Sequence, residues 1–276
     1  MKMLEVNNLT TEFSTENGIV KAVRDVSFYV DKGEVLGIVG ESGSGKSQTM
    51  FSVMGLLAAN GKVTSGSIKI DGKEISPLSF DSNKKYEETM DEIRGNDMAM
   101  IFQDPMTFLN PTLRIETQLI EPIINHNPGI SKTDALNKAI DLMRKVGIPS
   151  PEKRIRQYPH QFSGGMRQRV SIVRSLSYDP KLLLMDEPFG ALDALTRDSL
   201  NIELLKIWEQ TKKTILFVTH SIDEAVFLSS KVIVMSPRPG RIKEILDIDL
   251  GYPRTVEIRN NPKFIEYSKY LREVLE

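Results

Sequence analysis

The eight residues GESGSGKS, from Gly40 to Ser47, constrain this chain more than any other stretch, because they directly follow the apolar run VLGIV at 35–39. They match the pattern G-x-x-x-x-G-K-[ST] in the setting that the pattern requires, between a strand and a helix. Small residues let backbone N–H groups wrap around phosphates, and the N-terminus of the following helix adds partial positive charge. We therefore predict a phosphate-binding loop that opens a helix near Lys46.

The side chains of this loop suggest separate roles. Lys46 is predicted to contact the terminal phosphates of a nucleotide, and the Ser47 hydroxyl is predicted to ligate Mg²⁺. The other nucleotide-binding candidates of the loop are Gly40, Glu41, Ser42, Gly43, Ser44, Gly45 and Gln48. A flexible, glycine-rich surface turn is the alternative explanation, and the remaining motifs discriminate between the two.

Composition excludes several other classes of protein. The 276 residues include 36 Lys and Arg against 37 Asp and Glu, so the formal charge of −1 does not suggest a strongly basic nucleic-acid binder. The absence of cysteine excludes disulfides, thiolate metal sites and cysteine nucleophiles. The polar start MKMLEVNN does not resemble a signal peptide, and no apolar run approaches the roughly 18 residues that cross a bilayer. We expect such a chain to serve a membrane only by docking onto a protein that spans it.

Short apolar runs predict the core of the fold. Five of them have the length and polar flanks of strands buried on both faces: 35–39, 98–102, 182–185, 214–218 and 232–235. Helical patterns between the runs predict a mainly parallel sheet with helices on its faces. The N-terminal segments predict a separate antiparallel β layer that includes a turn at Asp71-Gly72. The expected class is an α/β P-loop NTPase with an inserted α-helical subdomain.

The domain organisation follows from changes in pattern along the chain. A nucleotide-binding core is predicted over 1–103 and 162–240, and a helical subdomain with several prolines is predicted as an insert over 104–161. Residues 241–276 form a C-terminal extension in this prediction. The polar stretch 76–97 is expected to be a surface excursion with a short helix.

Polar residues end three of the predicted strands. Because ligands bind at the carboxyl ends of parallel strands, these residues are expected to meet at the phosphate loop. Asp186 is predicted to hold Mg²⁺ and Glu187 to polarise the attacking water as a general base. His220 is predicted to sense the γ-phosphate, and Gln103 to complete the shell of Mg²⁺ and water. The alternatives are a carboxylate pair that only caps a strand, a structural histidine and a polar strand terminus.

The stretch QFSGGMRQR predicts a second anion site. Ser163 can cap a helix whose first turn contains Gly164 and Gly165, which leaves free N–H donors at a positive dipole end. This helix is expected to run to about Tyr178. Since the chain already has one phosphate loop, an economical use of the second site is to complete the nucleotide site of another copy.

Together these motifs resemble the nucleotide-binding subunit of an ATP-binding cassette (ABC) transporter. GESGSGKS looks like the family's Walker A, IFQDP its Q-loop, FSGGM its signature, LLLMDE its Walker B, ALD at 191–193 its D-loop and His220 its switch histidine. The motifs occur in the family's order, and the resemblance covers almost the whole chain. The signature reads FSGGM instead of LSGGQ, and both changes spare Ser163, Gly164 and Gly165.

The resemblance implies an ATPase that uses ATP and Mg²⁺. It implies a head-to-tail dimer in which the Walker A of one subunit and Ser163, Gly164 and Gly165 of the other bind each ATP. Asp193 would touch the facing site, and Phe13 would stack on adenine, although a strand phenylalanine can also be a core residue.

Partners and location are likewise implied by the resemblance. The partners would be membrane-spanning permease subunits, a second ATPase subunit that is identical or paralogous, and indirectly an extracytoplasmic substrate-binding protein. No nucleic-acid partner is expected. The protein would lie peripherally on the cytoplasmic face of the cell membrane.

The subfamily signal is mixed. Up to about Arg169, IFQDPMTFLNP and YPHQFSGGMRQRV look like oligopeptide, dipeptide and nickel importer ATPases. From about Ser171, DEPFGALDALTR, FVTHSIDEAVFLS and MSPRPGRI look like nitrate, sulfonate and taurine importer ATPases. Permease contacts are expected mostly from the insert, which favours peptide-type cargo. The alternatives are a sulfonate, nitrate or taurine importer ATPase, an exporter ATPase, an ABC ATPase that acts on nucleic acid, and a non-catalytic nucleotide-gated module.

Overall fold

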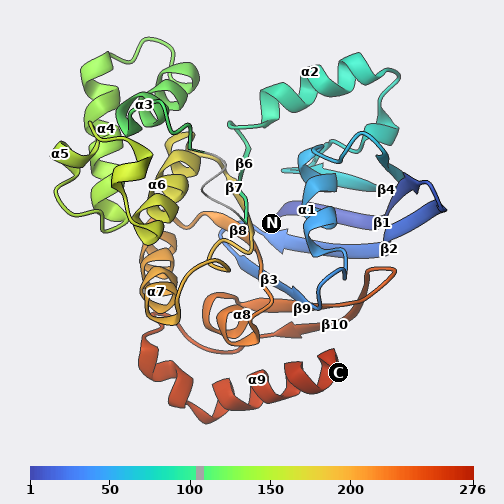
Figure 1. Cartoon of the computed structure of the whole chain (residues 1–276). Helices are drawn as coiled ribbons and strands as arrows, with labels where there is room; N and C mark the ends of the chain where they lie inside the picture. Colours follow the sequence, from blue (N-terminus) through green and yellow to red (C-terminus); the bar gives the residue numbers. More distant parts are fainter. Residues whose placement is uncertain (104–108) are drawn as a thin grey trace.

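Two β-sheets carry the fold, and a group of helices lies to one side of them (Figure 1). The computed structural model describes residues 1–103 and 109–276. The smaller sheet has the strand order β2-β1-β4-β5, and the larger sheet has the order β10-β9-β3-β8-β7-β6. The predicted combination of an N-terminal antiparallel layer with a mainly parallel core sheet is confirmed.

The smaller sheet is antiparallel throughout. Its strands are β1 (Lys2–Thr15), β2 (Gly18–Asp31), β4 (Gly61–Ile70) and β5 (Lys73–Glu74). Asp71 and Gly72, with φ of 48° and 82°, form the tight turn between β4 and β5. Two consecutive positive φ angles are what such a hairpin turn requires, so the predicted turn is confirmed.

The larger sheet contains the five predicted apolar runs as parallel strands. Its strands are β3 (Val35–Gly40), β6 (Met98–Ile101), β7 (Leu182–Asp186), β8 (Thr214–Val218), β9 (Lys231–Ser236) and β10 (Arg241–Asp247). The sixth strand, β10, pairs antiparallel to β9 at the edge of the sheet. The C-terminal residues after Gly240 therefore begin with a strand of the core sheet.

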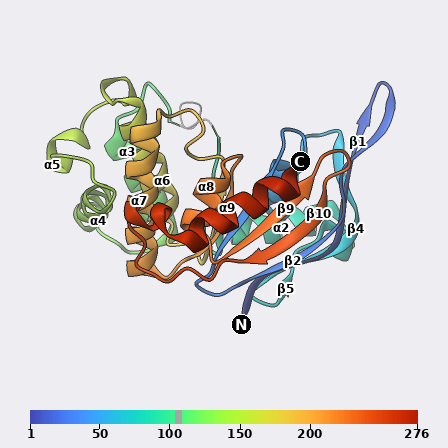
Figure 2. The ribbon, with the colours of Figure 1, turned by 90° about the horizontal axis from the view of Figure 1, so that it is seen from below.

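Helices cover both faces of the larger sheet (Figures 1 and 2). The α-helices are α1 (Lys46–Met54), α2 (Asn83–Ile93), α3 (Ile115–His126), α4 (Lys132–Lys145), α5 (Pro151–Arg154), α6 (Gly164–Ser177), α7 (Ala194–Thr211), α8 (Ile222–Leu228) and α9 (Pro262–Leu275). Short 3₁₀ turns lie at Pro77–Ser79, Pro159–Gln161 and Val256–Asn260. Helix α2 occupies the predicted surface excursion, and α6 packs against α3 and α4 of the predicted insert.

The larger sheet separates two hydrophobic clusters. Leu183 and Phe217 point into the cluster shared with the helical side, whereas Leu184 and Leu216 point into the cluster shared with the smaller sheet. Alternate residues of the same strands are therefore buried on opposite faces, which explains why these strands are uninterrupted apolar runs. In the part of the chain that the structure describes, no helix has the length and apolar character to cross a membrane.

Arg254 connects the C-terminal segment to the core through hydrogen bonds. The buried Arg254 guanidinium donates from Nη1 to the carbonyl oxygens of Val226, Phe227 and Ser229, at 2.8, 3.0 and 2.9 Å. These carbonyls lie at the C-terminal end of α8, where helix carbonyls lack intrahelical partners. Helix α9 then packs against α8 and β9. The C-terminal segment thus supports the elements that follow β8.

Candidate functional site

The predicted phosphate loop connects β3 to α1 and depends on its glycines. Gly43 and Gly45 have φ of 78° and 82°, a region that L-residues rarely adopt. A Cβ on Gly45 would lie 2.6 Å from the Ala22 carbonyl oxygen, and one on Gly40 would lie 2.5 Å from Ser44 Oγ. No side chain caps the N-terminus of α1. The first N–H groups of α1 are therefore left to an acceptor from outside the helix.

Lys46 places a buried positive charge in this loop. Its side chain is only 5% exposed, and Nζ donates to the carbonyl oxygens of Gly40 and Glu41 at 2.8 and 3.0 Å. Nζ also lies 4.0 Å from Glu187 Oε1. Burial lowers the pKa of the Lys46 ammonium, while the Glu187 and Asp186 carboxylates oppose that shift. A bound anion would compensate this poorly solvated charge.

Ser47 and Asp186 form the part of the site that fits a magnesium ion. The Ser47 hydroxyl donates to Asp186 Oδ1 at 2.9 Å, and Asp186 is only 3% exposed. Burial raises the pKa of the Asp186 carboxyl, so a cation beside it would be favourable. Hydroxyl and carboxylate oxygens are ligands that Mg²⁺ accepts, with water and phosphate completing its shell. The described residues contain no group of three or more His, Cys, Asp or Glu that could hold a metal by themselves.

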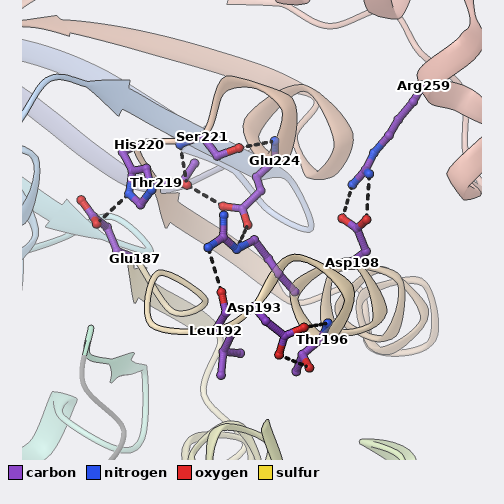
Figure 3. Close-up of polar contacts among 11 residues, drawn as sticks. Glu187, Leu192, Asp193, Thr196, Asp198, Thr219, His220, Ser221, Glu224 and Arg259 are labelled. Carbon is purple, nitrogen blue, oxygen red and sulfur yellow. Dashed lines mark hydrogen bonds and ion pairs between the residues drawn. The ribbon is translucent and has the colours of Figure 1, made fainter. Parts of the chain in front are cut away.

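Glu187 is the centre of a polar cluster at the ends of three strands. His220 Nδ1 lies 3.0 Å from Glu187 Oε2 (Figure 3). Gln103 Nε2 donates to the same oxygen at 3.4 Å. Glu187 has a φ of 43°, which directs its side chain out of the strand β7 that precedes it. The parallel order of β6, β7 and β8 brings the three side chains together, as the strand-end argument predicts.

These side chains and the loop surround one pocket of about 390 Å³. The residues that line it are Ser42, Gly43, Ser44, Gly45, Lys46, Ser47, Gln48, Gln103, Glu187 and His220. Asp186 does not line the pocket itself but accepts a hydrogen bond from the lining residue Ser47. A single face thus presents N–H donors, a buried ammonium, a candidate Mg²⁺ position and a candidate base.

The predicted second anion site lies apart from this pocket. Ser163 caps α6 by accepting a hydrogen bond from the Met166 N–H at 3.3 Å, so the predicted cap is confirmed. Ser163 and Gly164 are exposed, and neither they nor Gly165 line the pocket. Asp193 is also outside the pocket, where it caps α7 by accepting from the backbone N–H of Thr196 at 3.0 Å.

Phe13 does not contribute to the lining of the pocket. Phe13 lies in β1, half-buried, with its ring so close to Gly61 that a Cβ on that glycine would lie 2.5 Å from Cε1. The contact of Phe13 with adenine stays a prediction. The start of the predicted insert, at 104–108, lies outside the described residues.

Sequence reasoning did not single out Arg238. This exposed residue precedes Pro239 in the turn between β9 and β10, and a Cβ on Gly43 would lie 3.6 Å from its Nε. The turn therefore brings a further cation beside the phosphate loop. The sequence did contain a signal for Arg238, because an Arg-Pro-Gly turn follows the buried strand β9. If β9 lies beside β3 in a parallel sheet, that turn lies at the same edge as the phosphate loop.

Comparisons with known proteins place these observations in a family. A family model described as "ABC transporter" matches residues 23–190. A dipeptide transport ATP-binding protein of Lactococcus lactis is 46% identical over 85% of this chain and 65% of its own length. An oligopeptide transport ATP-binding protein of Bacillus subtilis is 44% identical over 90% of this chain and 67% of its own length. The chain thus spans about two thirds of the length of these relatives.

A relative of similar length and a solved structure extend the comparison. An uncharacterised ABC transporter ATP-binding protein of Methanocaldococcus jannaschii is 39% identical over 99% of this chain and 91% of its own length. A dimeric ATP-binding cassette, solved in a post-hydrolysis state bound to ADP and Pi, has a TM-score of 0.76. It is 27% identical over 91% of this chain and 100% of that chain.

Proposed function

Since this chain belongs to the ABC transporter family, we propose that it is an ATP-hydrolysing subunit that drives import through a membrane permease. The observation that carries the proposal is the convergence of Lys46, the Ser47–Asp186 pair and the Glu187–His220 pair on one pocket. These residues come from α1, the end of β7 and the turn after β8, and together they meet the needs of nucleotide binding, Mg²⁺ binding and water activation.

In the proposed reaction the chain's residues bind, hold and orient. The loop N–H groups and Lys46 would hold the phosphates. Ser47 and Asp186 would hold Mg²⁺, which would supply positive charge to the site. Glu187 accepts the proton of the attacking water as general base. His220 and Gln103, which both contact Glu187 Oε2, fix the orientation of this carboxylate.

The second half of the site comes from another subunit in this proposal. Ser163 and Gly164 are exposed and lie apart from the pocket of their own chain, which supports a role toward a facing nucleotide. Asp193 is exposed at the start of α7. Its neighbours Leu192 and Thr196 lie near the two glycines, since a Cβ on Gly164 would be 4.0 Å from Leu192 Cδ2 and one on Gly165 would be 2.8 Å from Thr196 Cγ2. Asp193 is proposed to touch the same facing site. The dimeric solved cassette bound to ADP and Pi supports this arrangement.

The cargo proposed is of peptide type. The relatives that are 43–46% identical over most of this chain are named as dipeptide or oligopeptide transport ATP-binding proteins. A sulfonate, nitrate or taurine importer remains the second candidate, on the motifs after Ser171. The helical insert, with α3 to α5 in its described part, is proposed to contact the permease at the cytoplasmic face of the membrane.

Glu187→Gln tests the catalytic part of the proposal. The variant is expected to bind ATP with unchanged affinity and to hydrolyse it at least about 100-fold more slowly, because it loses the general base. It should also accumulate as an ATP-bound dimer in size-exclusion chromatography. The control is Glu34→Gln, a similarly buried carboxylate that pairs with Lys231 away from the pocket and should leave turnover intact. Normal turnover in Glu187→Gln would assign the base elsewhere.

The cargo is tested in the assembled transporter. The chain, its permease subunits and their binding protein are reconstituted in vesicles, and ATP turnover is measured with dipeptides and oligopeptides, or with taurine, sulfonates and nitrate. Stimulation by peptides alone is expected. Stimulation by the second group alone would replace peptide cargo with the alternative and leave the ATPase assignment unchanged.

A further inference from the structure

A chain of polar contacts leads from the residues before α7 to the turn that carries His220 (Figure 3). Arg197, in the first turn of α7, donates from Nη2 to the Leu192 carbonyl oxygen at 3.0 Å. Its Nε lies 3.7 Å from Glu224 Oε1, in α8. Glu224 Oε2 accepts a hydrogen bond of 2.6 Å from the hydroxyl of Thr219, the residue before His220.

Glu224 is a buried carboxylate that the proposed chemistry does not use. Its side chain is 8% exposed, and a buried charge is unfavourable unless hydrogen bonds and an opposite charge compensate it. Oε2 receives the Thr219 hydroxyl, but within the described chain Oε1 has no hydrogen-bond donor and Arg197 Nε has no acceptor. The two buried atoms of opposite charge thus face each other just beyond hydrogen-bond length.

This spacing makes the contact sensitive to small movements. A charge-assisted N–H···O bond spans about 2.7–2.9 Å and is roughly twice as strong as a neutral one. A shift of about 1 Å between α7 and α8 would therefore complete the Arg197–Glu224 bond. The Thr219 hydroxyl also accepts from the Ser221 N–H at 3.0 Å, so Glu224 is connected to both sides of His220.

We propose that Arg197 and Glu224 are positioning residues that couple the Leu192-Asp193 segment to His220 within one chain. When Asp193 meets the facing subunit, the Arg197–Glu224 bond closes and the turn at His220 holds the imidazole against Glu187. The inference rests on the proposed function, because it requires that Asp193 contacts a second subunit. It adds a route within one chain. Contact of Asp193 with the facing nucleotide site would adjust the geometry of His220 in the chain's own site.

Glu224→Gln tests this coupling with little loss of packing. The variant keeps an oxygen for the Thr219 hydroxyl and removes the charge that faces Arg197. The kcat for ATP is expected to fall about tenfold, whereas KM and the affinity for a fluorescent nucleotide change less than about twofold. Arg197→Gln should give the same split. The double variant should be no slower than the slower single variant, because both residues act through one contact.

Arg259→Gln is the matched control. Arg259 forms a bidentate pair with Asp198 of the same helix α7, at 3.0 and 2.6 Å, and has no hydrogen bond to the turn of His220 among the described contacts. Its loss should lower the melting temperature and leave kcat within about twofold. All assays run well below the lowest melting temperature measured.

The possible outcomes separate the two proposals. Additive losses in the double variant, unchanged kcat in Glu224→Gln, or an equal loss of kcat in Arg259→Gln would overturn the coupling. Absence of Mg²⁺-dependent turnover in the unmodified protein would instead contradict the proposed ATPase function.

Discussion

The N-termini of α1 and α6 follow the same physical principle and have different surroundings. Gly45 precedes the first residue of α1, and Gly164 and Gly165 open α6, so small residues leave N–H groups at both termini accessible to an anion. At α1 the buried Lys46, the Glu187 carboxylate and the His220 imidazole complete the pocket around those donors. At α6 Ser163 and Gly164 are exposed, and residues 163–165 do not line the pocket that holds Glu187 and His220. The comparison teaches that a helix N-terminus becomes a catalytic site only through its neighbours, which in our proposal α6 obtains from another molecule.

Lys46→Ala should have the largest effect on nucleotide binding at α1, because it removes the only buried ammonium of the described pocket. ATP affinity is expected to fall by about 100-fold, or ~2.7 kcal/mol, and turnover should fall further. Equilibrium binding of a fluorescent nucleotide measures the loss. Lys231→Ala, which removes a lysine paired with Glu34 on the edge-side strand β9, should bind ATP normally. Unchanged affinity in Lys46→Ala would refute the assignment of the loop.

Ser163→Arg should separate binding from turnover. The bulky cation is expected to block the approach of α6 to a facing nucleotide, so turnover should fall about 100-fold while nucleotide affinity of the monomer stays unchanged. Ser131→Arg is the matched control, because Ser131 caps α4 in the same way and is also exposed. Full turnover in Ser163→Arg would count against assembly of the site across two subunits.

Mixing variants refines that test. In a dimer of one Ser163→Arg and one Lys46→Ala subunit, one composite site keeps both an intact loop and an intact α6 terminus. Recovery of turnover in the mixture indicates that one site works alone, whereas no recovery indicates obligate coupling of both sites.

Asp186→Asn should raise the stability of the nucleotide-free protein while abolishing Mg²⁺-dependent turnover. The variant keeps an oxygen for the Ser47 hydroxyl and removes a buried charge, so the free energy of unfolding should rise by about 1 kcal/mol at neutral pH. Thermal unfolding without nucleotide measures the change. Asp97→Asn, which loses an ion pair with Lys181 at 2.8 Å, should show no gain. A destabilised Asp186→Asn protein would mean that Lys46 outweighs the burial of the carboxylate.

The pH dependence of this difference has a definite sign. The pKa of Asp186 is raised in the folded chain, so the native state retains a proton that the unfolded state has released. The stability that Asp186 contributes is fully present below its unfolded pKa and is lost as pH rises through the folded pKa. Asp186→Asn should therefore gain most over the unmodified protein above that folded pKa, and the gain should vanish in acid.

Met166→Gln should have the smallest effect. It restores the commoner signature residue, and Ser163 caps α6 through the backbone N–H of residue 166, which the substitution keeps. Turnover is expected to stay within about twofold of the unmodified protein in a steady-state assay. A larger change would show that the side chain after the two glycines takes part in the facing site.

The sequence predicted the α1 site because every part of it follows a buried strand. Glu187 directly follows β7, and His220 is the second residue after β8. The parallel pairing of the two strands then places both residues at one edge of the sheet. The position of α6 outside the pocket was also foreseeable, because Ser163 begins a helix in a chain that already has a phosphate loop. The distance between Ser163 and a second chain depends on the shape of the surface around α6. Residues far apart in the sequence form that surface, so a sequence pattern does not predict it.

Other features were not predictable, for physical reasons. Strand β10, RIKEILD, alternates apolar and polar residues and lies at the sheet edge, so it lacks the continuous apolar run of the inner strands. Glu224 is a charged residue on a short helix, a pattern typical of the surface, and only the fold reveals that Arg197 and Thr219 surround it. Buried polar pairs between distant segments leave no periodic signal.

The contacts of Arg254 limit how far the chain can be shortened from its C-terminal side. A chain shortened near Gly240 would lose the guanidinium that satisfies the carbonyls of Val226, Phe227 and Ser229, and it would uncover the edge of β9. Open strand edges promote aggregation, and three unsatisfied carbonyls would loosen the helix behind His220. The family match ends at residue 190, but any attempt to graft or trim this cassette has to retain the residues up to α9.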